Sequence, residues 1–213
     1  INNLRKYSEL LSKNNSKALR LSGFLITIAL IIISGYCGWL IERLVFTDHK
    51  IIKSIGQIIL IFSLASAIAY KSLVQNVLDI LKLLQENHSD NNLKLAQKKL
   101  ANIVGRDTNN LDKQEILRAA AESTSENSVD GIFAPIFWML IGLLAWDFSP
   151  ALPGPLAMSW IFKASSTIDS MLGYKQGNLY WLGYAGAKLD DLLTWIPCRL
   201  VLITLPLISK EWV

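Results

Sequence analysis

Charged side chains recur at helical spacing around residues 118–135, RAAAESTSENSVDGIFAP, and this is the part of the sequence best suited to chemistry. The charges follow one another three or four residues apart, so a helix would place them on one polar stripe. The stripe consists of Glu115, Arg118, Glu122, Glu126 and Asp130. Carboxylate oxygens are the hard ligands that Mg²⁺ prefers, and a nucleotide phosphate usually completes its coordination.

A simpler interpretation is a solvated helix face with ion pairs between residues four apart, and the stripe taken alone favours it. Three features favour a site. The opposite side, Ala119 and Ala120, is small and apolar, and the stripe lacks the interspersed lysines of a typical solvent face. It also ends where a strongly apolar segment begins. Before it, Asp112 followed three residues later by Glu115 is typical of a helix start.

A second polar segment, residues 163–199, contains further groups that bind phosphates or cations. Its glycines allow tight turns and a close approach of the backbone to a ligand. The aromatic residues Tyr180, Trp181 and Tyr184 fit an interfacial aromatic belt, and a flat macrocyclic ligand would also favour such a surface. The candidate polar residues are Asp169, Tyr174, Lys175, Asp190, Asp191 and Arg199.

The composition indicates a membrane protein. Hydrophobic residues make up 52% of the 213 residues and charged residues 18%, against about 25% charged residues in soluble proteins. The net charge of +4, without a basic cluster interleaved with aromatics, gives no indication of nucleic-acid binding. Cys37 and Cys198 lie far apart in apolar segments, and His49 and His88 lack a ligand pattern around them, so zinc or histidine chemistry is not expected.

Four or five apolar segments are expected to cross the membrane. The first contains no charge over 21 residues, which at ~1.5 Å per residue matches a hydrocarbon core of ~30 Å. The third and fourth are short and are separated by Asp147 and a proline-rich turn, so they cross together, tilt or form a re-entrant pair. The segments are residues 21–41, 54–70, 132–146, 148–162 and 192–209. We therefore expect an all-α fold, a polytopic membrane helical bundle forming a single domain over residues 1–213.

Lys and Arg are distributed unevenly between the connections. Residues 1–20 carry five and residues 71–131 carry eight, whereas residues 147–155 carry none. The positive-inside rule then predicts that the N-terminus and a helical segment over 71–131 are cytoplasmic. The 147–155 turn faces outside, and a loop region over 163–191 returns to the cytoplasm. Both polar segments would then face the side of a cell membrane where ATP is available.

Four stretches, in this order and spacing, resemble the sequence blocks of the adenosylcobinamide-phosphate synthase family, an integral-membrane enzyme of cobalamin biosynthesis. They are GRDT (105–108), RAAAESTSENSVDGIFAP (118–135), STIDSMLGYK (166–175) and GAKLDDLLTWIPCR (186–199). The resemblance implies a ligase that uses ATP and Mg²⁺. It joins adenosylcobyric acid, through a propionate carboxylate, to aminopropanol or its O-phosphate. Activation of a carboxylate needs positive charge and a metal at the phosphoryl group, and no G-x-S-x-G nucleophile motif is present.

The resemblance also implies roles for individual residues. Catalytic roles fall to Arg106, Asp107, Glu122, Glu126, Asn127 and Asp169, and the expected metal ligands are Glu122, Glu126 and Asp130. Arg106 and Asp107 would lie at the phosphates, whereas Asp169 would take the proton of the amine or bind its ammonium form. Substrate contacts are expected from Tyr174, Lys175, Asp190, Asp191 and Arg199. For the last three, an Asp–Arg network that fixes the final helix is an equally good interpretation.

The sequence departs from the family at its ends. The family begins with a further apolar segment carrying a His-Pro motif and continues past the last span, so we expect a chain truncated at both ends. Other enzymes of the pathway are candidate partners beside the lipid bilayer.

Two alternatives compete with the ligase. A small transporter or assembly subunit predicts polar residues within the bilayer, whereas residues 21–41 and 54–70 carry no charge. A CDP-alcohol phosphotransferase would have Arg where Pro135 stands and Asp where Asn127 stands.

Overall fold

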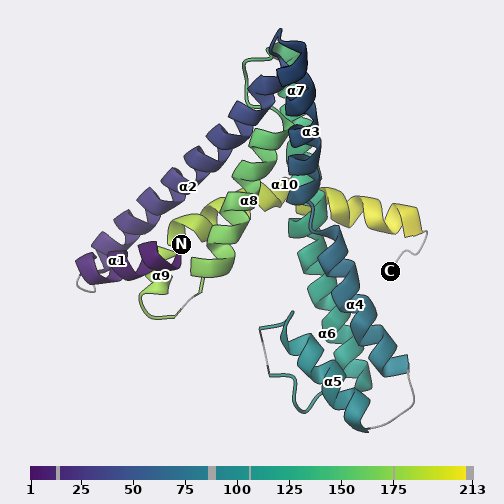
Figure 1. Ribbon diagram of the computed structural model, residues 1–213. Helices are drawn as coiled ribbons and strands as arrows, with labels where there is room; N and C mark the ends of the chain where they lie inside the picture. Colours follow the sequence, from purple (N-terminus) through teal and green to yellow (C-terminus); the bar gives the residue numbers. More distant parts are fainter. Residues whose placement is uncertain (13–14, 86–89, 106, 175, 210–213) are drawn as a thin grey trace. The chain divides into compact units, whose positions relative to one another are not determined.

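The computed structural model describes the chain except residues 13–14, 86–89, 106, 175 and 210–213. Its described part is helical and contains no strand, which confirms the all-α prediction (Figure 1). The elements are α1 (Asn2–Ser12), α2 (Ser16–Val45), α3 (Lys50–Ala67), α4 (Tyr70–Gln85), α5 (Asp90–Ala101), α6 (Lys113–Ser128), the π-helix η1 (Val129–Phe133), α7 (Ala134–Phe148), α8 (Pro155–Leu172), α9 (Leu179–Leu182) and α10 (Tyr184–Ser209).

Contacts divide the chain into two compact units, which we describe separately. The bundle unit comprises Ile1–Ile68 and Phe133–Val213, and the α4–α6 unit comprises Ala69–Ile132. We expected a single membrane domain with a helical segment over residues 71–131. The α4–α6 unit coincides with that segment to within two residues at its N-terminal end.

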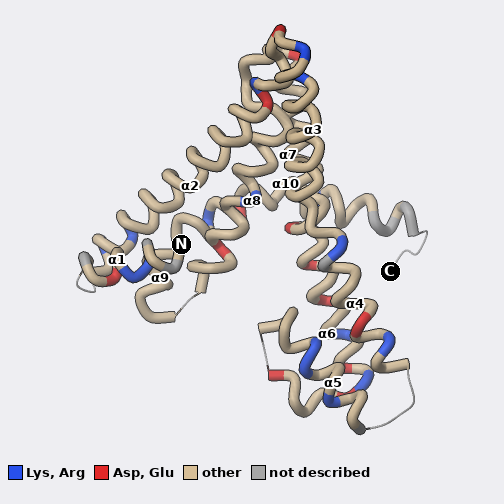
Figure 2. Tube along the Cα trace, in the orientation of Figure 1, with Lys and Arg blue, Asp and Glu red and all other residues tan. Residues whose placement is uncertain are grey.

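Three stretches of the described chain are long and apolar enough to cross a membrane: Ser16–Val45, Lys50–Ala67 and Lys113–Phe148. They contain the predicted spans 21–41 and 132–146, and most of 54–70. Only 22%, 11% and 28% of their most apolar windows are buried inside the protein. Helices that expose apolar side chains while satisfying their own backbone hydrogen bonds are suited to lipid. Figure 2 shows the middle of α2 and of α3 without charged residues.

The fourth predicted span begins too early. The fourth was expected over 148–162, but α8 begins only at Pro155, because Pro150, Pro153 and Gly154 form a turn before it. The fifth predicted span, 192–209, lies entirely within α10, which begins earlier, at Tyr184. The loop region expected over 163–191 is therefore largely helical. Packing explains this, because Ile168 and Leu172 are buried against α2 and α9.

Helix α8 holds the bundle unit together, since α2, α7 and α10 all pack against it. Glycines of α2 permit its close approach to α8 and to α9. A Cβ at Gly38 of α2 would lie 2.8 Å from the Cα of Ala157 in α8. A Cβ at Gly23 would fall on the carbonyl oxygen of Leu182, at the other end of α2. Small residues at such crossings allow helices to pack closely in lipid.

The C-terminal end of α2 forms hydrogen bonds with the turn between α7 and α8. The Trp39 indole nitrogen donates to the Ala151 carbonyl at 2.9 Å, and an Arg43 nitrogen donates to the Pro150 carbonyl at 3.2 Å. Between them Glu42, only 1% exposed, accepts hydrogen bonds from the backbone at the start of α8. The connection after α2 and the connection before α8 therefore lie at the same end of the bundle unit (Figure 1).

The α4–α6 unit has its own apolar core. The core consists of Ile80, Leu84, Ala96, Leu100, Ile116, Ala119 and Ala120. An ion pair between Lys99 and Asp79, 2.7 Å long, links α5 to α4. Helix α6 begins with the predicted capping box, in which Asp112 accepts from the Glu115 N–H and the Glu115 carboxylate accepts from the Asp112 N–H.

Candidate functional site

The acidic stripe lies on α6 as predicted. Glu122 and Glu126 are exposed, while Ala119 and Ala120 are 1% and 4% exposed and belong to the core. Ala119 does not lie opposite the stripe as the sequence suggested, because it precedes Glu122 by three residues and Glu126 by seven, which places it beside them. Asp130 follows in η1, where one turn holds an extra residue. Such π turns frequently occur at functional sites. The regular α-helical stripe therefore ends at Glu126, and Asp130 follows it in a wider turn.

An open hollow of about 400 Å³ lies beside this stripe. Residues of α6 and of the segment after α5 line it: Ile103, Val104, Gly105, Ala119, Glu122, Ser123, Glu126 and Asn127. The Ser123 hydroxyl donates to the Ile103 carbonyl at 2.7 Å and accepts from the Asn127 amide nitrogen at 3.0 Å. This pair of hydrogen bonds ties α6 to the opposite wall. It leaves the amide oxygen of Asn127 as the atom suited to a ligand.

The oxygen ligands at the hollow suit a cation that binds together with a phosphate. Among the described residues, no group of three or more His, Cys, Asp or Glu side chains is arranged to hold a metal ion. Glu122 and Glu126 share the hollow, while Asp130 does not line it. Mg²⁺ commonly takes one or two carboxylates and completes its octahedron with waters and substrate phosphates. Two carboxylates and an amide oxygen meet that requirement.

The GRDT block forms part of the loop between α5 and α6. Arg106 lies outside the described residues. Asp107 is exposed, and its carboxylate accepts from the Asn109 backbone at 3.0 Å and from the Asn109 side chain at 2.8 Å. Thr108 is 3% exposed and donates to the Gln97 carbonyl at 2.9 Å. The block thus contains the exposed carboxylate of Asp107 and, directly after it, the buried hydroxyl of Thr108, which ties the loop to α5. This contact of Thr108 could not be predicted from the sequence.

Replacing Thr108 by valine is expected to destabilise the α4–α6 unit by about 1 kcal/mol, because the buried hydrogen bond to α5 is lost while the side-chain volume is kept. Thr108→Ser keeps the hydroxyl and is the matched control. Thermal unfolding, with proteolysis of the loop after α5 as a second readout, measures the difference. Equal losses for the two variants would show that the methyl group, not the hydrogen bond, is what matters.

The candidates of the second polar segment lie in the bundle unit. Asp169, on α8 beyond the predicted span 148–162, is half-buried; burial, and secondarily the charge of Asp191, raise the pKa of its carboxyl. Its neutral form therefore persists to higher pH than that of an exposed aspartate. Tyr174 is exposed, and Lys175 lies outside the described residues. Asp190 and Asp191 lie within α10.

Arg199 has a different neighbour from the one expected. Its guanidinium lies 3.7 Å from the centre of the Trp195 ring and donates to the Trp195 carbonyl at 3.0 Å. Asp191 instead accepts from Lys188 at 3.3 Å. The Asp–Arg network considered from the sequence is therefore replaced, for Arg199, by a cation–π contact within one turn of α10.

The aromatic residues also have a specific contact. The Arg20 guanidinium lies 4.6 Å from the Trp181 ring centre and 4.7 Å from the Tyr184 ring centre. These rings thus hold the first turns of α2 against α9 and α10, in addition to any role at the bilayer surface. The sequence predicted the aromatic surface but not its cationic partner.

The predicted site residues thus fall into two groups, one in each unit. Asp107, Glu122, Glu126, Asn127 and Asp130 belong to the α4–α6 unit, and Asp169, Tyr174, Asp190, Asp191 and Arg199 belong to the bundle unit. The structure brings Glu122, Glu126 and Asn127 together at the hollow, and it brings Asp169 close enough to Asp191 for their charges to interact.

The long apolar helices place the chain among polytopic helical membrane proteins, and its acidic hollow lies on a separate helical unit. The family model described as CobD/Cbib protein matches residues 1–212, and the chain belongs to that family. This membership confirms the resemblance carried by the four sequence blocks. No solved structure matches the chain.

Curated relatives carry the name cobalamin biosynthesis protein CobD. A relative from Synechocystis is 42% identical over 198 residues, which is 93% of this chain and 54% of the relative. One from Halalkalibacterium halodurans is 36% identical over 79% of this chain and 48% of its own length. One from Leptospira interrogans is 31% identical over 98% of this chain and 60% of its own length. The chain thus spans about half the length of the curated relatives it matches.

Proposed function

We propose that this chain acts in cobalamin biosynthesis, as the membrane-bound ligase that joins aminopropanol or its O-phosphate to adenosylcobyric acid. The observation that carries the proposal is the hollow at which Glu122, Glu126 and Asn127 meet. These three residues lie in one of the four sequence blocks that resemble the synthase family, within a chain that belongs to the CobD/Cbib family. The Lys and Arg distribution supports a cytoplasmic position for the hollow at the cell membrane.

The proposed chemistry is the formation of one amide bond. ATP with Mg²⁺ would supply activation of the carboxylate, most simply as an acyl phosphate. Glu122 and Glu126 would hold the cation and Asn127 would orient an oxygen of the phosphate or substrate. For Asp169 the family resemblance implies contact with the amine, either by accepting its proton or by binding its ammonium form. Burial raises the pKa of the Asp169 carboxyl, so it binds a proton more readily than an exposed aspartate does.

Replacing Glu126 by glutamine is expected to lower the conversion of cobyric acid about 100-fold. A loss of this size is typical when an enzyme loses one group that stabilises a developing charge. The side chain keeps its size, but it loses its charge and one of its two acceptor oxygens. The assay uses membranes from a strain that lacks the enzyme and expresses the full-length protein, and it follows corrinoid product together with ATP use.

Glu115→Gln is the matched control, since Glu115 lies on the same helix and is exposed, but takes part in the capping box and does not line the hollow. Conversion at the wild-type rate by Glu126→Gln, or an equal loss of conversion in Glu115→Gln, would refute the assignment of the hollow as the cation site. For the ligase itself, ATP use must require both cobyric acid and the amine. Uptake of labelled substrate without ATP turnover would instead identify a transporter.

A further inference from the structure

Helix α1 has a face that combines exposed apolar side chains with a basic one. Tyr7 is 66% exposed and Leu10 is 75% exposed, and Asn3 and Lys6 are exposed beside them. The four positions follow the spacing i, i+3, i+4 and i+7, which places them on one side of a helix. Together they line an open groove of about 350 Å³.

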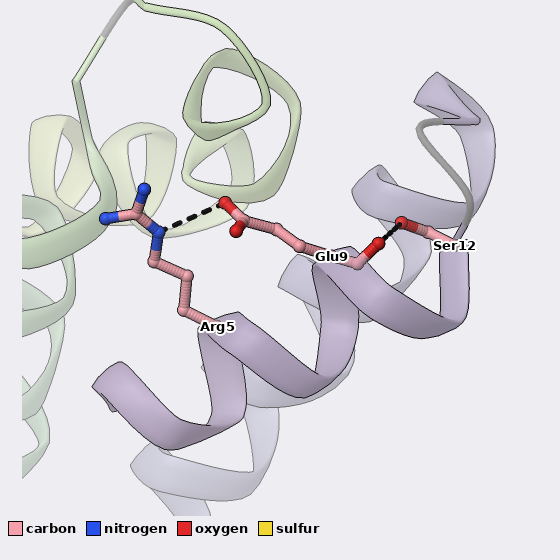
Figure 3. Close-up of polar contacts among 3 residues, drawn as sticks. All are labelled: Arg5, Glu9 and Ser12. Atoms are coloured by element: carbon pink, nitrogen blue, oxygen red, sulfur yellow. Dashed lines mark hydrogen bonds and ion pairs between the residues drawn. The ribbon is translucent and has the colours of Figure 1, made fainter.

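The other side of α1 is fixed to the protein. Ser8 and Ser12 are 9% and 7% exposed, and α1 packs against α2. Figure 3 shows the Arg5 guanidinium donating to the Glu9 carboxylate at 3.1 Å, while the Ser12 hydroxyl donates to the Glu9 carbonyl at 3.3 Å. Glu9 is the one acidic residue in the sequence of α1, and Arg5 neutralises it. The exposed face is therefore left with the positive charge of Lys6.

The position of α1 matches the level of lipid headgroups. It lies beside the first turns of α2, which is long and apolar enough to cross the membrane (Figure 1). Those turns carry the exposed cations Lys17 and Arg20, and Arg20 lies against two aromatic rings. Basic and aromatic residues concentrate where a membrane helix meets the headgroups.

We propose that α1 is an interfacial helix that binds the headgroup region of an anionic bilayer. Tyr7 and Leu10 insert at the boundary with the acyl chains, and Lys6 contacts lipid phosphates. An amphipathic helix with a basic polar face binds membranes in this way, through apolar burial together with attraction to anionic lipid. The charge of the face selects an anionic lipid surface over an apolar protein partner, and the proposal does not depend on the ligase activity.

Site-directed spin labelling of the full-length protein in vesicles tests this. A label at Leu10→Cys, in a background with Cys37→Ser and Cys198→Ser, is compared with Phe24→Cys on exposed α2 as the lipid reference and with Asn110→Cys in an exposed turn as the water reference. In vesicles of phosphatidylcholine and phosphatidylglycerol, the label at residue 10 should favour oxygen over a water-soluble nickel chelate. That preference should fall several-fold in phosphatidylcholine alone, or with Lys6→Glu, while the label at residue 24 stays unchanged.

Three results would overturn the proposal. Access of the nickel chelate to residue 10 equal to that at residue 110, in both kinds of vesicle, would place the face in water. Exclusion of both oxygen and the chelate would show that protein covers it, either another segment or a second copy. A preference for oxygen that does not depend on anionic lipid would remove the role assigned to Lys6.

Discussion

Replacing Glu42 by alanine is expected to destabilise the bundle unit by at least about 3 kcal/mol, since hydrogen bonds to a charged group each contribute roughly 1.5–3 kcal/mol. Its carboxylate accepts from the backbone nitrogens of Gly154 at 2.8 Å, Leu156 at 2.6 Å and Ala157 at 3.1 Å. These are N–H groups at a helix start, which have no partner inside the helix. The positive end of the α8 dipole further favours a carboxylate there.

Alanine at position 42 would leave these donors buried, because Glu42 is only 1% exposed and Leu156 and Ala157 are fully buried. The loss should appear as a marked fall in the midpoint of thermal unfolding of the full-length protein in detergent. Glu42→Gln retains one acceptor oxygen but turns an N–H₂ group toward a backbone donor, so it should fall between alanine and wild type. Asp48→Ala, exposed in the connection after α2, is the control. Equal midpoints of thermal unfolding for the alanine variants at positions 42 and 48 would show that the Glu42 carboxylate does not stabilise the start of α8.

Glu42 also shows what sequence reasoning overlooks. Reading the apolar run 21–41 placed Glu42 just outside the span, where a charge is ordinary. Its partners lie 112 to 115 residues further along the chain. Periodicity reports which residues share a helix face, but it carries no information about which other helix start that face meets. The apolar helices could therefore be predicted from sequence, whereas the contact that holds α8 in place could not.

For the candidate site, predictions based on local spacing were reliable. The capping box at Asp112 and Glu115 follows from the three- or four-residue spacing of neighbours on a helix, and it is confirmed. The contact of Arg199 with Trp195 has the same spacing and could have been predicted from it.

For the same site, contacts between different elements could not be predicted from the sequence. The hydrogen bonds from Ser123 to Ile103 and from Thr108 to Gln97 join segments whose pairing depends on how α5 and α6 pack. The π turn at Val129–Phe133 also lacked a sequence signal. In the structure, the Gly131 carbonyl of that turn accepts from the Ala69 backbone at 2.8 Å, so a tertiary contact accompanies it.

Gly142→Ala is expected to destabilise the bundle unit by about 3 kcal/mol, the upper part of the usual range for overpacking. A Cβ at this position of α7 would fall on the carbonyl carbon and oxygen of Gly154. Those atoms cannot retreat, because the Trp146 ring packs against Gly154 and the Gly154 N–H donates to Glu42. Backbone atoms that are held on two sides can move away from an added methyl group much less than the end of a flexible side chain can.

Gly131→Ala is the matched control for this prediction. Gly131 is also buried, but an added Cβ would meet only the Ala69 Cβ, at an ordinary 3.4 Å. Alanine there should leave the unfolding midpoint unchanged or raise it slightly, because glycine is a poor helix former. A wild-type midpoint for Gly142→Ala, or an equal fall for both variants, would show that the α7 crossing tolerates a methyl group. Since Gly142 and Glu42 both act on Gly154, the double variant Glu42→Ala/Gly142→Ala should lose less than the sum of the single losses.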